Sequence, residues 1–215
     1  MDSLREPVVG IDVGGRRKGF HAVALIEGRF RKQECFDEPK KVVDWCLSLE
    51  ATVVAVDAPC AWAIKGSSRA VERDLNKRKI RCFYTPTKVL AEQNEKGFYG
   101  WVLNGQSLYD ALKFSKYQLF DGNYREGRVC LETFPHAIVC ALTKVGSAKP
   151  KKRKRLEALL KAGYNRDLEA LTKIDFIDAA LCAVAADCFR KKNFEPIGDR
   201  CEGFIVVPKS CTSSS

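Results

Sequence analysis

The chain has 215 residues, of which 46% are hydrophobic, so it is long enough to bury a large core and too apolar to be disordered throughout. No apolar run reaches the length of a membrane span, and the first residues lack the basic and then apolar pattern of a secretory signal. We therefore expect a cytoplasmic protein without a membrane partner. The formal net charge of +10 favours polyanionic partners, although a basic surface alone is weak evidence for one.

The ten cysteines lie scattered in apolar segments of a chain too long for a small disulfide scaffold, and we interpret them as reduced thiols. No two of them have the two-residue gap of a zinc knuckle or a redox pair, so a structural zinc site is not expected. The two histidines, His21 and His136, are too far from any clear nucleophile to indicate a catalytic triad.

The first part of the chain is typical of β-strands. Residues 8–13 and 20–25 are apolar, β-rich runs on either side of a Gly- and Arg-rich connector, which predicts a hairpin. Residues 29–36 alternate loosely and predict a third strand that completes an antiparallel meander. A helix is predicted to begin at Pro39, because apolar residues then recur at helical spacing. Residues 52–59 form an apolar run without alternation, which predicts a strand buried on both faces.

The middle of the chain changes in composition. Residues 62–126 are basic and broken by turn residues, and we interpret them as a mostly helical insertion over one end of the sheet. Within the insertion, residues 88–120 predict two helices. A strand is predicted again at 128–135 and a helix at 136–145.

The last part of the chain is predicted to be mainly helical. A dense basic run at residues 149–155 opens one helix, and the last long helix is expected over 171–191. A short strand is expected at 204–208. The whole pattern predicts one α/β domain over residues 1–208, with antiparallel strands first and buried strands later, followed by a polar tail.

Acidic residues mark several of these predicted elements. They are Asp12, Asp57, Glu132, Asp175 and Asp178. Carboxylates that converge on one end of a sheet repel one another by several kcal/mol unless divalent cations separate them. Because oxygen ligands suit Mg²⁺ or Mn²⁺, the pattern predicts a two-metal mechanism, in which paired ions activate a water and stabilise the leaving oxygen in phosphodiester hydrolysis. The alternative is that each acid caps a helix, closes a turn or forms an ion pair separately.

Five short motifs occur in one order along the chain: GIDVGG, VAVDAP, SSRAVERDL, LETFP and DFIDAALCAVAA. Their order resembles the DUF429 family, whose members are expected to be nucleases, and the resemblance covers nearly the whole chain. It implies a ribonuclease H-like fold with three antiparallel strands, a helix, two further parallel strands and a late helix. It also implies that four residues match the family's acidic positions as catalytic and metal-binding residues, with Asp175 as a neighbour that supports them. The four are Asp12, Asp57, Glu132 and Asp178.

Four basic residues are candidate contacts to substrate phosphates: Arg69, Arg73, Lys152 and Arg153. The two arginines, with Glu72 between them, resemble the family's Arg-x-x-Glu-Arg motif, so they could hold a phosphate near the metal ions. Equally, Glu72 could pair with an arginine and brace the insertion. The other two belong to the basic run at 149–155, which suits a polyphosphate backbone but also resembles an ordinary solvated charge run or a nuclear-localisation signal.

Three classes of function follow from these observations. The first is a nuclease that uses Mg²⁺ or Mn²⁺ to hydrolyse phosphodiester bonds in nucleic acid. The second is a non-catalytic module that keeps the fold and charge and binds nucleic acid or protein. The third is a nucleotide-binding protein of the actin and sugar-kinase type, which begins with a similar Asp-x-Gly turn. This third class is less favoured, because 215 residues hold only one of the two domains that such proteins need.

Overall fold

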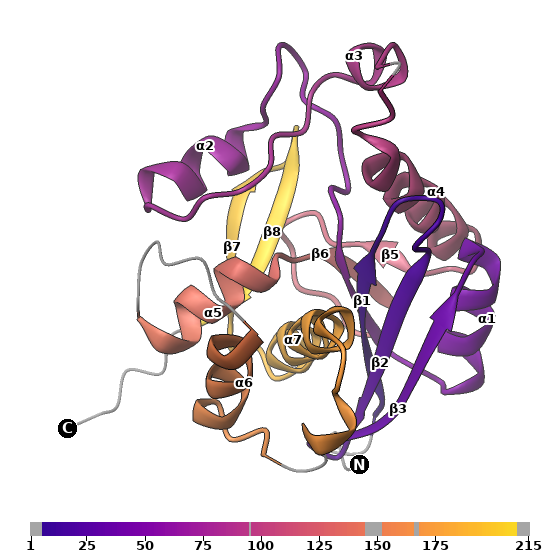
Figure 1. Cartoon of the computed structure of the whole chain (residues 1–215), viewed down its shortest axis with the longest axis vertical. Coiled ribbons are helices and arrows are strands. Elements are labelled where there is room, and N and C mark those ends of the chain that lie inside the picture. Colours follow the sequence, from indigo (N-terminus) through magenta and orange to yellow (C-terminus); the bar gives the residue numbers. More distant parts are fainter. Residues whose placement is uncertain (1–5, 95, 145–151, 166–167, 210–215) are drawn as a thin grey trace.

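The computed structural model describes residues 6–94, 96–144, 152–165 and 168–209. In these ranges the chain forms a mixed α/β fold with one eight-stranded sheet and seven α-helices (Figure 1). The strands are β1 Val8–Val13, β2 Phe20–Ile26, β3 Arg29–Phe36, β4 Val53–Asp57, β5 Gln118–Leu119, β6 Val129–Glu132, β7 Phe194–Asp199 and β8 Gly203–Pro208. The helices are α1 Pro39–Ser48, α2 Ala70–Lys77, α3 Lys88–Glu92, α4 Gly100–Phe114, α5 Pro135–Thr143, α6 Lys152–Lys161 and α7 Ile174–Arg190, with a 3₁₀ turn at Leu168–Ala170.

The sheet has the strand order β3-β2-β1-β4-β6-β8-β7, with β5 paired to the beginning of β6. The first three strands are antiparallel neighbours, whereas β4 is parallel to β1, β6 to β4 and β8 to β6. β7 closes the far edge as the antiparallel partner of β8. The sheet is therefore mixed, with an antiparallel meander at one side and mostly parallel strands after it.

Helices cover both faces of the sheet, because its central strands are apolar on both sides. Val8 of β1 and Ala55 of β4 belong to a core with α7, whereas Val9 and Ile11 belong to a second core with α1 and α4. α7 lies directly on β1: a Cβ atom at Gly10 would be 2.0 Å from the backbone oxygen of Ala179. The small residues of α7 therefore let the helix approach the sheet closely.

The predicted order of elements agrees with the structure over the meander, the buried strand at β4, the strand at β6 and the helices α1, α5, α6 and α7. The expected insertion differs in its placement. It does not lie only over one end of the sheet, because Leu108 and Leu112 of α4 are buried with α1 against one face. It also contains the short strand β5, which joins the sheet.

Besides β5, two other elements were not predicted from the sequence, α2 and β7. The β7 sequence FEPIGD contains proline, glycine and two acids, all of which are depleted in strands. Its strand conformation comes from the hairpin with β8, in which Gly198 has a φ of 120° and lies against the backbone oxygen of Gly203. Among the described residues, no helix combines the length and the apolar character needed to cross a membrane.

Candidate functional site

Two of the predicted acids lie side by side at one edge of the sheet. Asp12 is near the end of β1 and Asp57 ends β4, and the two residues are register partners in this parallel pair. Alternation along each strand puts both side chains on the face covered by α7, with Val8 and Ala55. Asp57 is half-buried, and among the described residues none donates a hydrogen bond to its carboxylate.

The beginning of α7 brings the other two aspartates to this edge. Asp175 and Asp178 are three positions apart on the helix and therefore share one face. Asp178 is 9% exposed and accepts a hydrogen bond of 2.7 Å from Nη1 of Arg155 on α6. Asp175 forms an ion pair with Lys18 from the turn between β1 and β2.

Three of the aspartates at this edge have pKa values well above that of a free carboxyl group. Burial raises the pKa of Asp12 to about 6, against the lowering effect of Lys18. Burial and the charge of Asp12, opposed by Arg155, raise the pKa of Asp178 to about 7. The pKa of Asp57 is raised well above its usual value by burial and then by the charges of Asp12 and Asp178. The three carboxyl groups are thus close enough for each charge to oppose the next.

Asp175 behaves differently. Burial would raise its pKa, but the hydrogen bond and charge of Lys18 bring the pKa below the usual value. Asp175 is therefore the acid of this group that holds its negative charge most readily.

The donor set suits a hard divalent cation in its chemistry. Oδ2 of Asp12 and Oδ1 of Asp178 are buried and have no hydrogen-bond partner, which is rare for buried carboxylate oxygens. Such oxygens are the ligands that Mg²⁺ and Mn²⁺ prefer. As the side chains stand, the described residues contain no group of three or more His, Cys, Asp or Glu arranged to hold an ion. Lys18 and Arg155 supply positive charge there, so an ion would compete with these two cations.

Glu132 lies on the other face of the sheet from these aspartates. Its neighbour Leu131 is in the core with α7, and Cys130 is in the core with α4, so alternation directs Glu132 toward α4. Both carboxylate oxygens of Glu132 accept hydrogen bonds from Arg69, at 2.6 and 2.8 Å, and one also accepts from the backbone nitrogen of Cys60. Glu132 is near enough to raise the pKa of Asp57, but its own oxygens are already occupied.

Arg69 is the centre of a buried ionic network. Its side chain is 1% exposed and also donates to Glu72, at 2.9 Å, and to the backbone oxygen of Glu202. These contacts tie α2 to β6 and to the turn between β7 and β8. The sequence left open whether Arg69 and Glu72 brace the chain or hold a phosphate. In the structure the two residues form a buried ion pair that braces the chain. Arg73, in contrast, is 52% exposed and contacts Glu202 at 3.4 Å.

The basic run is only partly described, because residues 149–151 lie outside the described ranges. Lys152 donates to the backbone oxygen of Thr172, and Arg153 is 90% exposed and pairs with Glu157. Neither contacts an aspartate of the site in the described contacts. A third member of the run, Arg155, does, and sequence reasoning did not single it out. One signal was present: Arg155 is four positions before the buried Leu159, so it shares the inner face of α6.

Two other residues of the site were missed. Lys18 was hidden in the basic composition of the connector after β1. His21 lies opposite Asp12 in the pairing of β1 with β2, is 7% exposed, and has a buried Nδ1 atom without a hydrogen-bond partner. Burial lowers the pKa of His21, although the charge of Asp175 opposes that effect. The register between the two strands, which the hairpin prediction implied, was the available signal for His21.

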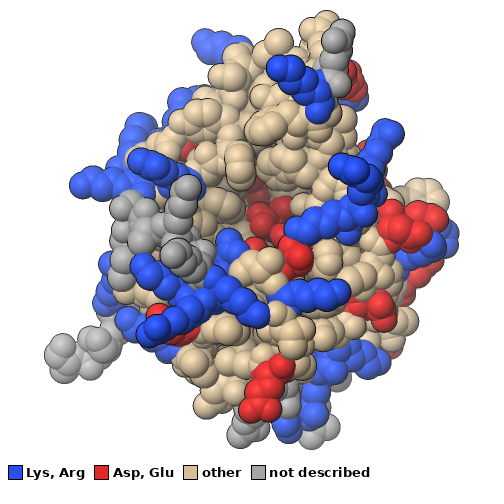
Figure 2. Space-filling view, in the orientation of Figure 1, with Lys and Arg blue, Asp and Glu red and all other residues tan. Residues whose placement is uncertain are grey.

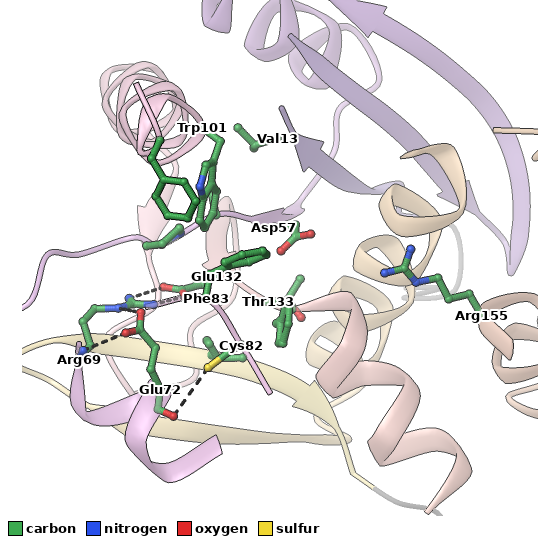
Figure 3. A pocket seen from close by; sticks show the side chains of 15 residues that line it. Val13, Asp57, Arg69, Glu72, Cys82, Phe83, Trp101, Glu132, Thr133 and Arg155 are labelled. Atoms are coloured by element: carbon green, nitrogen blue, oxygen red, sulfur yellow. Dashed lines mark hydrogen bonds and ion pairs between the residues drawn. The ribbon is translucent and has the colours of Figure 1, made fainter. Parts of the chain in front are cut away.

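A cavity of about 400 Å³ is lined by Asp57, Glu72 and Glu132, together with Arg69 and Arg155. Figure 3 shows Asp57 between two groups: Arg69, hydrogen-bonded to Glu72 and Glu132, on one side, and Arg155 on the other. Figure 2 shows acidic side chains inside a hollow that is bordered by Lys and Arg side chains. The arrangement combines a negative floor with a positive rim, which suits a ligand that carries phosphates and a bound cation together.

The fold and the site define a mixed α/β protein with a cluster of buried and half-buried aspartates, where the carboxyl ends of adjacent parallel strands meet the beginning of α7. Residues 10–200 match the model of the family described as protein of unknown function DUF429, so the chain belongs to this family. Searches of curated proteins and of solved structures gave no match to the chain.

Proposed function

We propose that the chain is a metal-dependent nuclease of ribonuclease H-like fold that hydrolyses phosphodiester bonds in nucleic acid. The observation that carries the proposal is the group formed by Asp12, Asp57 and Asp178, of which Asp57 lines the cavity. Burial and mutual repulsion raise the pKa values of these carboxyl groups, and two of them have buried oxygens without partners. A divalent cation would remove the repulsion and satisfy the oxygens.

The strand order supports the proposed fold. Three antiparallel strands are followed by β4 and β6, each added in parallel beyond β1, in the order β3-β2-β1-β4-β6. This is the arrangement that the family resemblance implies for a ribonuclease H-like core. Because a fold does not fix a function, the aspartates and the cavity, and not the strand order, support hydrolysis.

Each residue of the site would have a definite part in the reaction. A bound Mg²⁺ or Mn²⁺ would lower the pKa of the attacking water and stabilise the leaving oxygen. Asp12, Asp57 and Asp178 would hold the ion, and Asp175 would keep Lys18 in place beside them. Arg155 would leave Asp178 and pair with a substrate phosphate, for which its planar guanidinium is suited. Glu132 would act through the fold, by holding Arg69.

One observation favours a second candidate, a non-catalytic module that binds nucleic acid. The ion pairs of Lys18 with Asp175 and of Arg155 with Asp178 place protein cations where metal ions would otherwise be needed. If these pairs persist when nucleic acid binds, they hinder the uptake of an ion by the acids. The two candidates differ in turnover and in metal uptake, so one experiment separates them.

The test is cleavage of a panel of DNA, RNA, hybrid and branched substrates with Mg²⁺ or Mn²⁺, by the wild type and by Asp12→Asn and Asp57→Asn. Each substitution keeps the size of the side chain and removes a ligand charge, so cleavage should fall roughly 100-fold or more. Binding to nucleic acid, measured in EDTA, should survive or strengthen because repulsion of the phosphates is lost.

The matched control is Asp110→Asn, the same substitution at an exposed position of α4 that does not line the cavity. It should cleave like the wild type. The nuclease proposal is overturned if the wild type cleaves nothing on the panel, or if cleavage is unchanged in both site variants. Binding without cleavage would then favour the non-catalytic module.

A further inference from the structure

Exposed aromatic side chains gather at the mouth of the cavity. Phe83 is 67% exposed and Phe98 is 55% exposed, and their ring centroids are 6.3 Å apart. Trp101, in the first turn of α4, has its ring centroid 6.2 Å from that of Phe83. The three rings come from separate segments of the chain, the loop after α2, the loop before α4 and α4 itself. Large apolar side chains that remain exposed together in this way commonly mark a binding surface.

The aromatic rings and the acids share one cavity. Phe83, Phe98 and Trp101 line the cavity of about 400 Å³ that also contains Asp57 and Arg155 (Figure 3). This volume lies within the range of about 300 to 1,000 Å³ that is typical of small-ligand sites. A group held against the rings is therefore placed in the same space as the carboxylate of Asp57.

Two of these rings also border a second, positively charged cavity. Phe98 and Trp101 line a space of about 550 Å³ whose other wall contains Arg16, Arg17 and Lys18, from the turn between β1 and β2. Both arginines are exposed. A chain that passed over Phe98 and Trp101 would thus have cationic side chains for its phosphates on one side and the acidic site on the other.

We propose that Phe83, Phe98 and Trp101 stack on unpaired bases of a single-stranded nucleic acid, beside the acidic site. The inference rests on the proposed function in that it names the substrate of that site as a strand with at least one unpaired base. Aromatic rings and bases stack through their flat faces, and this contact tolerates any base. A base within a duplex has both faces covered by its neighbours, so it cannot make this contact.

The charges around the rings favour nucleic acid over an apolar protein segment. An apolar segment would need an uncharged surface of its own size, whereas this aromatic surface has cations in one adjoining cavity and Asp57 with Arg155 in the other. A nucleic acid matches each of these surfaces. Its phosphates suit the cavity with cations, its polar sugar suits the cavity with Asp57 and Arg155, and its flat bases suit the aromatic rings.

The test measures binding in EDTA, so that metal-dependent cleavage has no part in the result. The probes are fluorescently labelled oligothymidylate, the same strand paired to its complement, and an abasic strand of equal length, each followed by anisotropy. Phe83→Ala and Phe98→Ala should each weaken binding of the single strand by about 5- to 150-fold, the range expected for one stacked base. Their binding of the abasic strand should equal that of the wild type.

Two further variants serve as controls. One tests whether any apolar side chain can replace the aromatic ring, and the other tests whether loss of an exposed ring elsewhere also weakens binding. Phe83→Leu keeps an apolar side chain but removes the flat face, so it should bind the single strand as weakly as Phe83→Ala. Phe114→Ala removes a phenylalanine that is 88% exposed at the end of α4 and does not line the cavity, so it should bind like the wild type.

The inference is overturned if the wild type does not bind the single strand, or if it binds the duplex equally well. It is also overturned if Phe83→Leu binds like the wild type, or if the alanine variants lose affinity for the abasic strand to the same degree. Cleavage by a wild type whose aromatic variants bind normally would overturn this inference and leave the nuclease proposal standing. Stacking-dependent binding without any cleavage would support base binding and overturn the nuclease proposal.

Discussion

Arg155 of α6 donates from Nη1 to Oδ2 of Asp178 on α7 at 2.7 Å, and this contact leaves Oδ1 of Asp178 buried without a partner. The two side chains are 19% and 12% exposed, so water screens the pair only weakly. One carboxylate thus has an oxygen held by a protein cation and another that is unpaired. Whether a metal ion can bind at the site depends on how firmly Arg155 holds Oδ2 of Asp178.

Replacing Arg155 by Gln should therefore strengthen binding of Mn²⁺, because it removes the cation that competes for Asp178. The same change should destabilise the metal-free protein by roughly 2 kcal/mol, the usual contribution of a hydrogen bond to a charged group. Calorimetric titration with Mn²⁺ and urea denaturation in EDTA measure the two effects. Arg153→Gln, an equal change at a position that is 90% exposed, is the control and should alter neither. Unchanged Mn²⁺ affinity in Arg155→Gln would contradict competition between the two cations.

The raised pKa of Asp12 gives the stability of the protein a definite dependence on pH. Because this pKa is about 6 in the folded chain and near 3.8 in the unfolded chain, the protonated carboxyl group stabilises the fold below pH 3.8. That stability is lost as the pH rises through about 6, and the whole difference corresponds to roughly 3 kcal/mol.

The side chain that replaces Asp12 in Asp12→Asn cannot ionise, so the free energy of unfolding of this variant should not fall in this way as the pH rises. In EDTA, the stability of Asp12→Asn relative to the wild type should rise between about pH 4 and pH 8 by up to roughly 3 kcal/mol. Urea denaturation across this range measures the difference. Asp110→Asn should show no such trend, since its side chain is exposed on α4. A constant difference between Asp12→Asn and the wild type would mean that Asp12 is ionised throughout.

The two arginines of the Arg-x-x-Glu-Arg motif should differ sharply in their effect on stability. Arg69→Met leaves Glu72 and Glu132 buried without their cation, which should cost about 3 to 5 kcal/mol. Arg73→Met removes a side chain that is 52% exposed and should cost less than about 1 kcal/mol. Urea denaturation of the two variants is the measurement, and equal losses would be at odds with the assigned roles.

Much of the fold could be predicted because its early strands are regular. β1, β2 and β3 follow one another through short turns, and the unbroken apolar run at β4 is long enough to be a strand but not a helix. Asp12 and Asp57 could be placed at the same edge of the sheet because each lies at or near the end of such a strand. Asp178 was assigned to the same site through the resemblance to the DUF429 family, which implies a late helix and an acidic position at this residue.

The face on which Glu132 lies could not be predicted in the same way. In β6 both Cys130 and Leu131 are buried, so the sequence does not alternate and does not indicate which side chains share a face. Only the pairing of β6 with β4 fixes the face. The role of Arg155 was hidden for a related reason, since a run of basic residues does not indicate by charge which member turns inward.

Gly10 has a consequence beyond close packing. It lies two positions before Asp12 on the same face of β1, and a Cβ atom there would be 2.0 Å from Ala179 and 2.1 Å from Ala183 of α7. Any larger residue at this position would push α7 outward and carry Asp178 away from Asp12, with both carboxyl groups chemically unchanged. The gap that an ion would have to bridge is therefore set by a residue that has no side chain and takes no part in the chemistry. Two proteins with identical acids could differ in metal binding through this one position alone.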